Sequence, residues 1–323
     1  MIRIEPREKI SNSTKVLIPI IAAVVSLLFA AIPLLAAGAN PFVAYVEMAK
    51  GVFGSVFAIS EMLTRATPLI YTGLAAAIAF RAKLWNIGAE GQLYLGAIAA
   101  VTVGSGFFDL PAVLLLPLII VLGGCAGAVG MAAPTYLKVR FGADEVVTTL
   151  LLNFIIIIFL QMLLEGPLQD PMGLGWPQSA PILDQGMFPP LIDRMRVHSG
   201  LILAVLLAVI AHFIIKYSVW GFKLRAVGEN SAAAKHAGIN INRSLFGVAL
   251  LSGGLAGLAG VSEVAGLKGY LTADLSPGFG YAGIVVAMLA GLSPLGVLIA
   301  SVFIASVFPV SYTHLTLQTS ALV

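Results

Sequence analysis

The feature that most constrains this chain is a succession of long apolar windows without Asp, Glu, Lys or Arg. The first window, residues 16–37, runs for 22 residues. A helix needs about 20 apolar residues to cross the hydrocarbon core of a bilayer, because it rises about 1.5 Å per residue. Further windows lie at residues 66–80, 91–108, 110–137, 146–164, 199–215, 244–262 and from 275 onward. The pattern predicts an all-α, polytopic helical membrane protein.

Composition agrees with a membrane setting. Hydrophobic residues make up 59% of the 323 residues and charged residues only 10%, and the mean hydropathy is +1.01. Soluble domains carry about 25% charged residues. The first window is longer than the apolar core of a signal peptide, about 7 to 15 residues, and no small-residue cleavage site follows it. We therefore expect a retained first helix after a cytoplasmic segment at residues 1–15.

The last window must hold more than one helix. The sequence Gly291-Leu-Ser-Pro-Leu-Gly296 interrupts it with residues that disfavour helices, so we expect helices near 281–291 and 295–309. This gives nine segments, two of them short, in a transmembrane domain over residues 16–310.

Basic residues predict the orientation of these segments. An N-terminus inside the cell places 13 of the 18 Lys and Arg residues on the cytoplasmic side. That bias follows the positive-inside rule, so the net charge of +3 reflects topology and gives no reason to expect nucleic-acid binding. Two long loops result, an outer one at 165–198 and an inner one at 217–243. The inner residues are Arg3, Arg7, Lys9, Lys15, Arg81, Lys83, Lys138, Arg140, Lys216, Lys223, Arg225, Lys235 and Arg243.

A polar heptad, Asn86-Ile-Gly-Ala-Glu-Gly-Gln92, separates two apolar windows. An ionisable group at membrane depth costs about 2.5 to 3.5 kcal/mol on insertion scales, so it faces a cavity, a partner or a transported solute. The glycines beside Glu90 indicate a broken or re-entrant helix, and a second Gly-rich break lies at residues 276–283. The heptad therefore points to passage of a solute through a membrane.

The inner loop predicts a short helix that faces the cytoplasm. Asn230 or Ser231 suits an N-cap, the alanines that follow favour helix, and Gly238 suits a left-handed terminus. Such a helix rests on the membrane surface or docks into a groove of another protein. We favour docking because of the motifs that follow.

Five motifs occur in order along the chain, and in this order and spacing they are specific. Between residues 64 and 305 the chain resembles the permease subunit of a bacterial ATP-binding-cassette (ABC) importer, in the family that includes branched-chain amino acid, ribose and nucleoside permeases. The spelling is most like the nucleoside or simple-sugar branch. The motifs are Asn86 to Gln92; Asp144-Glu-Val-Val-Thr-Thr149 with Asn153; Leu224 to Asn230 with Ala233, Ala234 and Gly238; Leu251 to Gly260 with Glu263; and Ser276 to Gly283.

The resemblance implies a division of labour. In such importers two permease subunits form the membrane path, two cytoplasmic ATPases hydrolyse ATP, and an extracytoplasmic binding protein delivers the solute. This chain has no G-x-x-x-x-G-K-[ST] motif, so ATP and Mg²⁺ are expected on a separate ATPase chain, with no cofactor on this one. The bacterial inner membrane is the expected location. The residues that resemble the ATPase coupling loop are Gly228, Glu229, Asn230, Ala233, Ala234 and Gly238.

The candidate substrate path consists of Asn86, Glu90, Gln92 and Asn153. Their amides offer uncharged donors and acceptors, and no basic cluster in the windows would neutralise an anion. We expect Asn86 and Gln92 to face the solute. Glu90 instead serves to hold the broken helix, for example by capping the helix that starts near Gly91, and Asn153 suits either solute contact or an interhelical hydrogen bond.

Other polar and small residues have structural interpretations. Asp144 and Glu145 are expected to cap the following helix and to form an ion pair near Arg140. The glycines between Gly253 and Gly260 are expected to allow close helix packing. The single cysteine, Cys125, excludes an intrachain disulfide, and no metal site is expected.

Three alternatives stay open from the sequence. An ABC permease for branched-chain amino acids shares these motifs. An ion-coupled secondary transporter would use Glu90 or Glu145 as its cation site, and a passive channel would need no energy source. Catalytic motifs such as G-x-S-x-G and H-E-x-x-H are absent from the sequence, so an enzyme is disfavoured.

The stretch after residue 305 departs from the family pattern. It lacks the further glycine-rich helix and the final apolar span that such permeases carry. We expect residues 311–323 to be an atypical tail that arises from truncation or from joined foreign sequence.

Overall fold

A computed structural model of the chain describes residues 11–106 and 111–307. It divides into two units, residues 1–55 and 56–323. In the first unit, helix α1 (Asn12–Ala36) confirms the predicted first helix. Helix α2 (Pro41–Phe53) follows at a bend of 115°, with the side chain of Asn40 accepting a hydrogen bond from Phe42 N. Helix α2 is not among the predicted segments, because Glu47 and Lys50 interrupt its apolar run.

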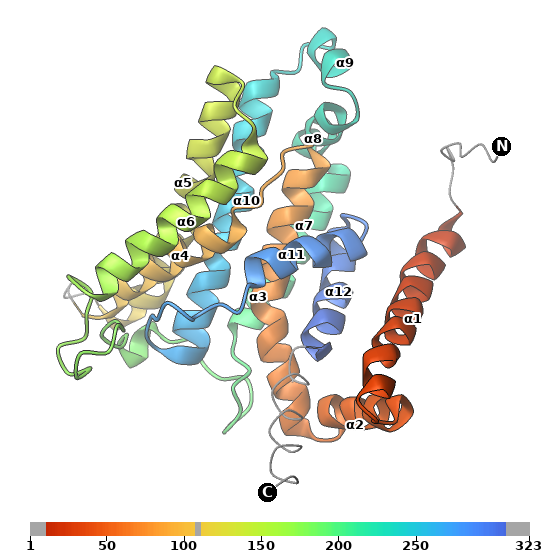
Figure 1. The fold of residues 1–323 in the computed structure, drawn as a ribbon. Helices are drawn as coiled ribbons and strands as arrows, with labels where there is room; N and C mark the ends of the chain where they lie inside the picture. The colour runs from red at the N-terminus through yellow and green to blue at the C-terminus, as the bar shows by residue number, and fades with distance from the viewer. Residues whose placement is uncertain (1–10, 107–110, 308–323) are drawn as a thin grey trace, which may run out of the picture. The chain divides into compact units, whose positions relative to one another are not determined.

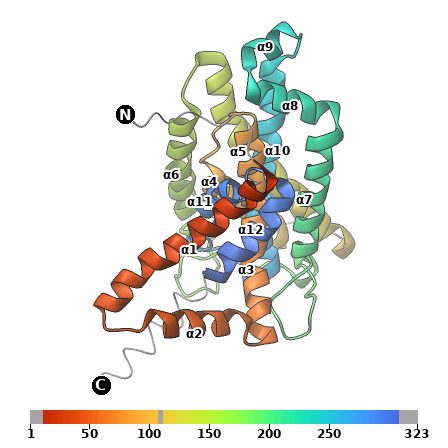
Figure 2. The ribbon, with the colours of Figure 1, turned by 90° about the vertical axis from the view of Figure 1, so that its right-hand side faces the viewer.

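The second unit is a bundle of helices (Figures 1 and 2). Among the residues that the structure describes, this unit has five helices that are long and apolar enough to cross a membrane. They start at Val56, Ala112, Glu145, Gly200 and Ile241. This confirms a polytopic helical membrane protein. The helices are α3 (Val56–Arg81), α4 (Ala89–Gly104), α5 (Ala112–Phe141), α6 (Glu145–Leu164), α7 (Gly200–Tyr217), α8 (Val219–Glu229), α9 (Ser231–His236), α10 (Ile241–Glu263) with the π-helical turn η2 (Val264–Lys268), α11 (Phe279–Leu289) and α12 (Pro294–Val307).

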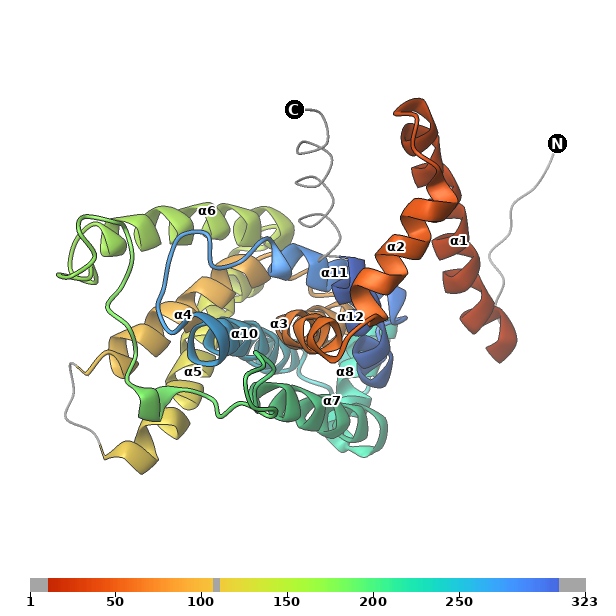
Figure 3. The same ribbon diagram turned by 90° about the horizontal axis from the view of Figure 1, so that it is seen from below.

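Helix α10 forms the centre of this unit, in contact with α3, α4 and α5 (Figure 3). Glycines make this closeness feasible. A Cβ atom on Gly257 would collide with the carbonyl oxygen of Gly123 on α5, and one on Gly260 would collide with the carbonyl oxygen of Leu93 on α4. The expectation that these glycines serve close helix packing is confirmed.

Helix α3 starts ten residues earlier than the charge-free window at 66–80. Arg65 immediately precedes that window and Glu61 lies four residues before Arg65, but both lie within the helix. At about 1.5 Å per residue, the 26 residues of α3 extend about 39 Å, enough to cross a bilayer. Charged residues inside a spanning helix therefore shortened the predicted segment.

Both expected breaks are present. Residues 82–88 separate α3 from α4, and residues 269–278 precede the half-length helix α11. The second loop is tied to the loop at 165–198, since Ile182 N donates to the carbonyl oxygen of Gly269 at 2.8 Å. Farther along it, the Tyr94 hydroxyl of α4 donates to the carbonyl oxygen of Ala273 at 2.7 Å. The loop thus runs into the bundle to start α11 beside α4 (Figure 1).

The loop at 165–198 contains one short helical turn, η1 (Asp184–Gly186), and isolated bridges such as Gln169 with Ser179. At the other end of the unit, α8 and α9 form the connection between α7 and α10. The predicted atypical tail at 311–323 and the first ten residues of the predicted cytoplasmic segment lie outside the described residues.

Candidate functional site: a polar network at the broken helices and a charged pocket

The side chains of Asn86 and Gln92 form a closed amide pair. Asn86 Nδ2 donates to Gln92 Oε1 at 2.8 Å, and Gln92 Nε2 donates to Asn86 Oδ1 at 2.9 Å. Asn86 Nδ2 also reaches Ser252 Oγ of α10 at 2.9 Å, and that hydroxyl donates to the carbonyl oxygen of Ala75 in α3 at 2.8 Å. Asn86 and Gln92 are both fully buried. The pair therefore joins the broken segment to α3, α4 and α10.

Asn153 of α6 uses both ends of its amide. Its Oδ1 accepts a hydrogen bond from Gly91 N at 2.8 Å, and its Nδ2 donates to the carbonyl oxygen of Ile87 at 3.0 Å. Nδ2 also reaches the Tyr281 hydroxyl of α11 at 3.2 Å. Asn153 is completely buried, so it acts as an interhelical hydrogen-bonding group in this conformation.

Glu90 binds the start of a different helix from the one expected. Its Oε2 atom accepts a hydrogen bond from Gly280 N, in the first turn of α11, at 2.6 Å. The positive end of a helix dipole stabilises a carboxylate at this position. Capping of its own helix, the sequence-based expectation, is replaced by a bond between the two broken elements. Close packing explains why: a Cβ atom on Gly280 would collide with the backbone of Glu90.

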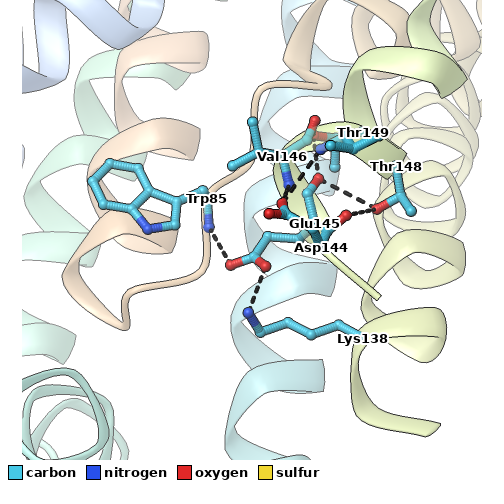
Figure 4. A network of polar contacts seen from close by, with 8 residues as sticks. Trp85, Lys138, Asp144, Glu145, Val146, Thr148 and Thr149 are labelled. Atoms are coloured by element: carbon cyan, nitrogen blue, oxygen red, sulfur yellow. Dashed lines mark hydrogen bonds and ion pairs between the residues drawn. The ribbon is translucent and has the colours of Figure 1, made fainter. Parts of the chain in front are cut away.

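A second polar cluster lies at the start of α6 (Figure 4). Asp144 caps the helix by accepting a hydrogen bond from Val146 N at 2.7 Å, as expected. Glu145 pairs with Lys138 at 2.5 Å instead of with Arg140, and it also accepts from Trp85 N at 3.3 Å. Lys138 replaces Arg140 as the partner because the two residues are two positions apart on α5, about half a helical turn, so their side chains leave the helix on different faces.

The loop between α7 and α10 contains two helices where one was expected. Asn230 ends α8 and caps α9, with Oδ1 accepting from Ala233 N at 3.0 Å. Gly238 adopts the left-handed conformation with φ +79°, as predicted. Gly228 packs so closely on the carbonyl oxygen of Arg81 that a Cβ atom would collide with it. Within α9 only Ala234 is buried.

The structure reveals a charged pocket of about 300 Å³ at the end of α3 opposite α9. Glu263 belongs to a predicted motif, but the sequence gives no sign that it meets the other pocket residues. Glu61 and Arg65, four residues apart inside a spanning helix, were the available signal, because charges at membrane depth call for partners. The charged residues that line the pocket are Glu61, Arg65, Arg196, Glu263, Lys268 and Asp274.

Comparison with known proteins places this fold in a family. Residues 58–320 match the model of the permease component of branched-chain amino acid transport systems. The chain belongs to this family, and it is therefore a membrane transport subunit.

Several curated relatives cover most of the chain. A guanosine ABC transporter permease of Bacillus subtilis is 36% identical over 299 residues, which is 90% of this chain and 84% of the relative. A glucose ABC transporter permease of Haloferax volcanii is 35% identical over 95% of this chain and 83% of its own length. A nucleoside ABC transporter permease of Lactococcus lactis is 34% identical over 90% and 82%. The search of solved structures gave no match.

Proposed function

We propose that this chain is the membrane-spanning permease subunit of an ATP-driven importer for a neutral polar solute, a nucleoside or a simple sugar. The observation that carries the proposal is similarity at 34 to 36% identity to permeases named for guanosine, glucose and nucleosides. The family description names branched-chain amino acids, but these three relatives favour the nucleoside and sugar branch. Delivery by an extracytoplasmic binding protein and pairing with a second permease subunit belong to the same proposal.

Coupling to a separate ATPase is assigned to α8 and α9. The short helix α9 is exposed except for Ala234, which leaves a free surface for a partner protein. Gly228 holds α8 against the end of α3, so movement of this loop would be passed to a helix that crosses the bundle. The proposed coupling residues remain Gly228, Glu229, Asn230, Ala233, Ala234 and Gly238.

The proposed orientation places α9 in the cytoplasm and the loop at 165–198 outside. Basic residues support it, because Arg81, Lys83 and Arg225 line one pocket beside α8. The N-terminus is cytoplasmic in the same proposal.

The proposed solute path passes the broken elements. The carboxylate of Glu90 holds α4 to α11 and so sets the shape of this region. Asn86, Gln92 and Asn153 stay candidates for solute contact, but their amides are paired with one another or with backbone. Contact with a solute therefore requires that these hydrogen bonds exchange during the transport cycle.

Reconstitution tests the proposal and its main rival. Uptake of guanosine or glucose into vesicles should require the ATPase chain and ATP. Uptake by this chain alone under a proton or sodium gradient would instead establish a secondary transporter, and uptake without any energy source would establish a channel.

Two variants test the coupling loop. Gly238→Pro removes the left-handed conformation, because proline fixes φ near −65°, and Ala233→Arg adds a bulky charge to the exposed face of α9. Both should insert in the membrane normally and abolish stimulation of the ATPase. Unchanged ATP-coupled uptake in both variants would refute the docking role of α9.

A further inference from the structure

The charged pocket has a balanced set of ionisable groups. Three carboxylates, from Glu61, Glu263 and Asp274, face three cations, from Arg65, Arg196 and Lys268. A volume of about 300 Å³ falls at the lower end of small-molecule sites, which measure about 300 to 1,000 Å³. A charge-balanced pocket of this size suits a small neutral ligand better than an ion.

Two of the possible ion pairs in the pocket are long and lie at its rim. Arg196 lies 3.6 Å from Glu61, and Lys268 lies 3.7 Å from Asp274. The side chain of Asp274 is 88% exposed and that of Arg196 is 63% exposed. Exposed pairs of this kind contribute little to stability, so they leave the interior of the pocket to be explained.

The interior holds polar groups that lack partners. Arg65 Nε and Glu61 Oε1 are buried and have no hydrogen-bond partner among the described residues. Glu263, which is only 3% exposed, lines the same pocket. A buried polar group without a partner is costly, and most such groups in folded proteins are satisfied by protein, water or a ligand. Two of them around one cavity, beside the carboxylate of Glu263, indicate a site for a polar ligand.

Two cations lie near Glu263. Arg65 and Lys268 line the same pocket and lie close enough for their charges to act on it. A third cation, such as the ammonium group of an amino acid, would be repelled by both, so a neutral group that donates hydrogen bonds suits Glu263 better. Two adjacent hydroxyls match a carboxylate well because both can donate to its two oxygens. Acidic side chains bind ribose hydroxyls in this way at dinucleotide sites.

We propose that this pocket binds the vicinal diol of a neutral solute, with Glu263 accepting from the two hydroxyls and Arg65 Nε donating to a hydroxyl oxygen. The shared chemistry is the diol of a ribose or of a hexose. The inference rests on the proposed function and adds to it the residues that select the solute. It places the selecting site at the end of the unit where a solute delivered from outside would enter.

Direct binding tests this without the binding protein. The purified permease and ATPase complex, in lipid nanodiscs, is titrated with guanosine, 2′,3′-dideoxyguanosine, glucose and leucine by saturation-transfer NMR. We expect guanosine or glucose to bind, and whichever binds more tightly identifies the diol as that of a ribose or of a hexose. Dideoxyguanosine and leucine should bind at least tenfold more weakly. Equal binding of guanosine and its dideoxy analogue, preferred binding of leucine, or no binding of any diol would overturn the proposal.

Variants locate the effect in the pocket. Glu263→Gln keeps the shape but replaces a carboxylate oxygen by an amide, and it should weaken diol binding about tenfold to a hundredfold, as expected for hydrogen bonds to a charged group. Asp274→Asn, the matched change at the exposed rim, should leave affinity unchanged. If Glu263→Gln does not assemble, Arg65→Lys keeps the charge and removes the Nε donor, and it should weaken diol binding likewise.

The outcomes separate this inference from the proposed function. ATP-driven uptake by the wild-type complex with unchanged diol affinity in Glu263→Gln and Arg65→Lys would remove the pocket assignment alone. Absence of ATP-driven uptake by the wild-type complex would remove the importer assignment, whatever the pocket binds.

Discussion

Two buried polar regions of this permease differ in how their hydrogen-bonding groups are used. At the broken helices, the side-chain amides of Asn86 and Gln92 are hydrogen-bonded to each other, and the amide of Asn153 is hydrogen-bonded to backbone groups. In the charged pocket, Arg65 Nε and Glu61 Oε1 have no hydrogen-bond partner among the described residues, and Glu263 lines the same cavity. A saturated network stabilises one arrangement of helices, whereas an unsaturated one has capacity for a ligand. The same burial therefore serves structure in one region and recognition in the other.

The largest expected effect comes from breaking the saturated network. Asn86→Leu leaves Gln92 without either amide partner and removes a donor to Ser252. Each buried polar group without a partner costs about 1 to 3 kcal/mol, so the free energy of unfolding should fall by about 3 kcal/mol or more. Unfolding in mixed detergent measures this free energy. Asn240→Leu, which changes an exposed helix cap, is the control.

The selectivity of Asn86→Leu should remain that of the wild type. Uptake of guanosine and glucose should fall by the same factor, because less folded protein reaches the membrane. A change in the ratio of the two rates would instead place Asn86 in contact with the solute.

The next effect concerns pH and the loop at 165–198. His198 is buried between Phe188, 5.6 Å away in a stacked pair, and Gly266, and its Nε2 atom has no partner among the described residues. Burial lowers the pKa of His198 from 6.5 to about 4. When the loop is open, His198 takes up a proton below pH 6.5, whereas in the closed loop it stays neutral until about pH 4. The free energy that favours the closed loop should therefore fall as the pH falls from 6.5 toward 4, and it should level off below pH 4. The change is at most about 1.4 kcal/mol per pH unit.

Hydrogen exchange of the amides of Phe188 and Ser199, corrected for the intrinsic effect of pH, measures this opening. In His198→Asn, which retains an acceptor for Gly200 N but does not titrate, the loop should exchange faster at all pH values and lose the pH dependence. Equal pH dependence in both proteins would assign the effect to another group.

A smaller effect is expected from Glu90→Gln. The amide oxygen still accepts from Gly280 N, but the negative charge at the start of α11 is lost. Charge at a helix terminus contributes about 0.3 to 1 kcal/mol, and up to about 2 kcal/mol when partly buried, so thermal stability should fall modestly. ATP-driven uptake should persist. Complete loss of uptake with normal stability would support a proton-carrying role for Glu90.

The smallest effect is expected at the rim of the pocket. Asp274→Asn removes an ion pair with Lys268 whose carboxylate side is largely exposed. Exposed pairs contribute between about 0 and 1 kcal/mol, so the free energy of unfolding should stay within that range of the wild type. A larger loss would show that the rim pairs hold the loop at 269–278 in place.

The sequence predicts much of this fold because apolar windows report directly on helices in a membrane. It also locates both breaks and the left-handed Gly238, since glycine-rich polar segments cannot continue a spanning helix. It fails for α2 and for the first ten residues of α3, because Glu47, Lys50, Glu61 and Arg65 fall within helices. A charged residue interrupts an apolar window in the sequence, but it does not end a helix when partners in the folded protein accommodate the charge.

The sequence identifies the residues of the candidate site better than it identifies their hydrogen-bond partners. Asn86, Glu90, Gln92 and Asn153 do converge on the broken helices, but no local rule tells that Glu90 binds α11, which begins 189 residues later in the sequence. The charged pocket joins α3, the end of α10 and two loops, so only the folded arrangement brings Arg65 and Glu263 together.

One matched substitution in each region tests the central claim most directly. Selectivity for guanosine over 2′-deoxyguanosine in ATP-driven uptake is measured for Glu263→Gln and for Glu90→Gln beside the wild type. We expect Glu263→Gln to lose most of that selectivity, and Glu90→Gln to retain it while melting at a lower temperature. Retained selectivity in Glu263→Gln, or lost selectivity in Glu90→Gln, would contradict the division between a structural network and a recognition pocket.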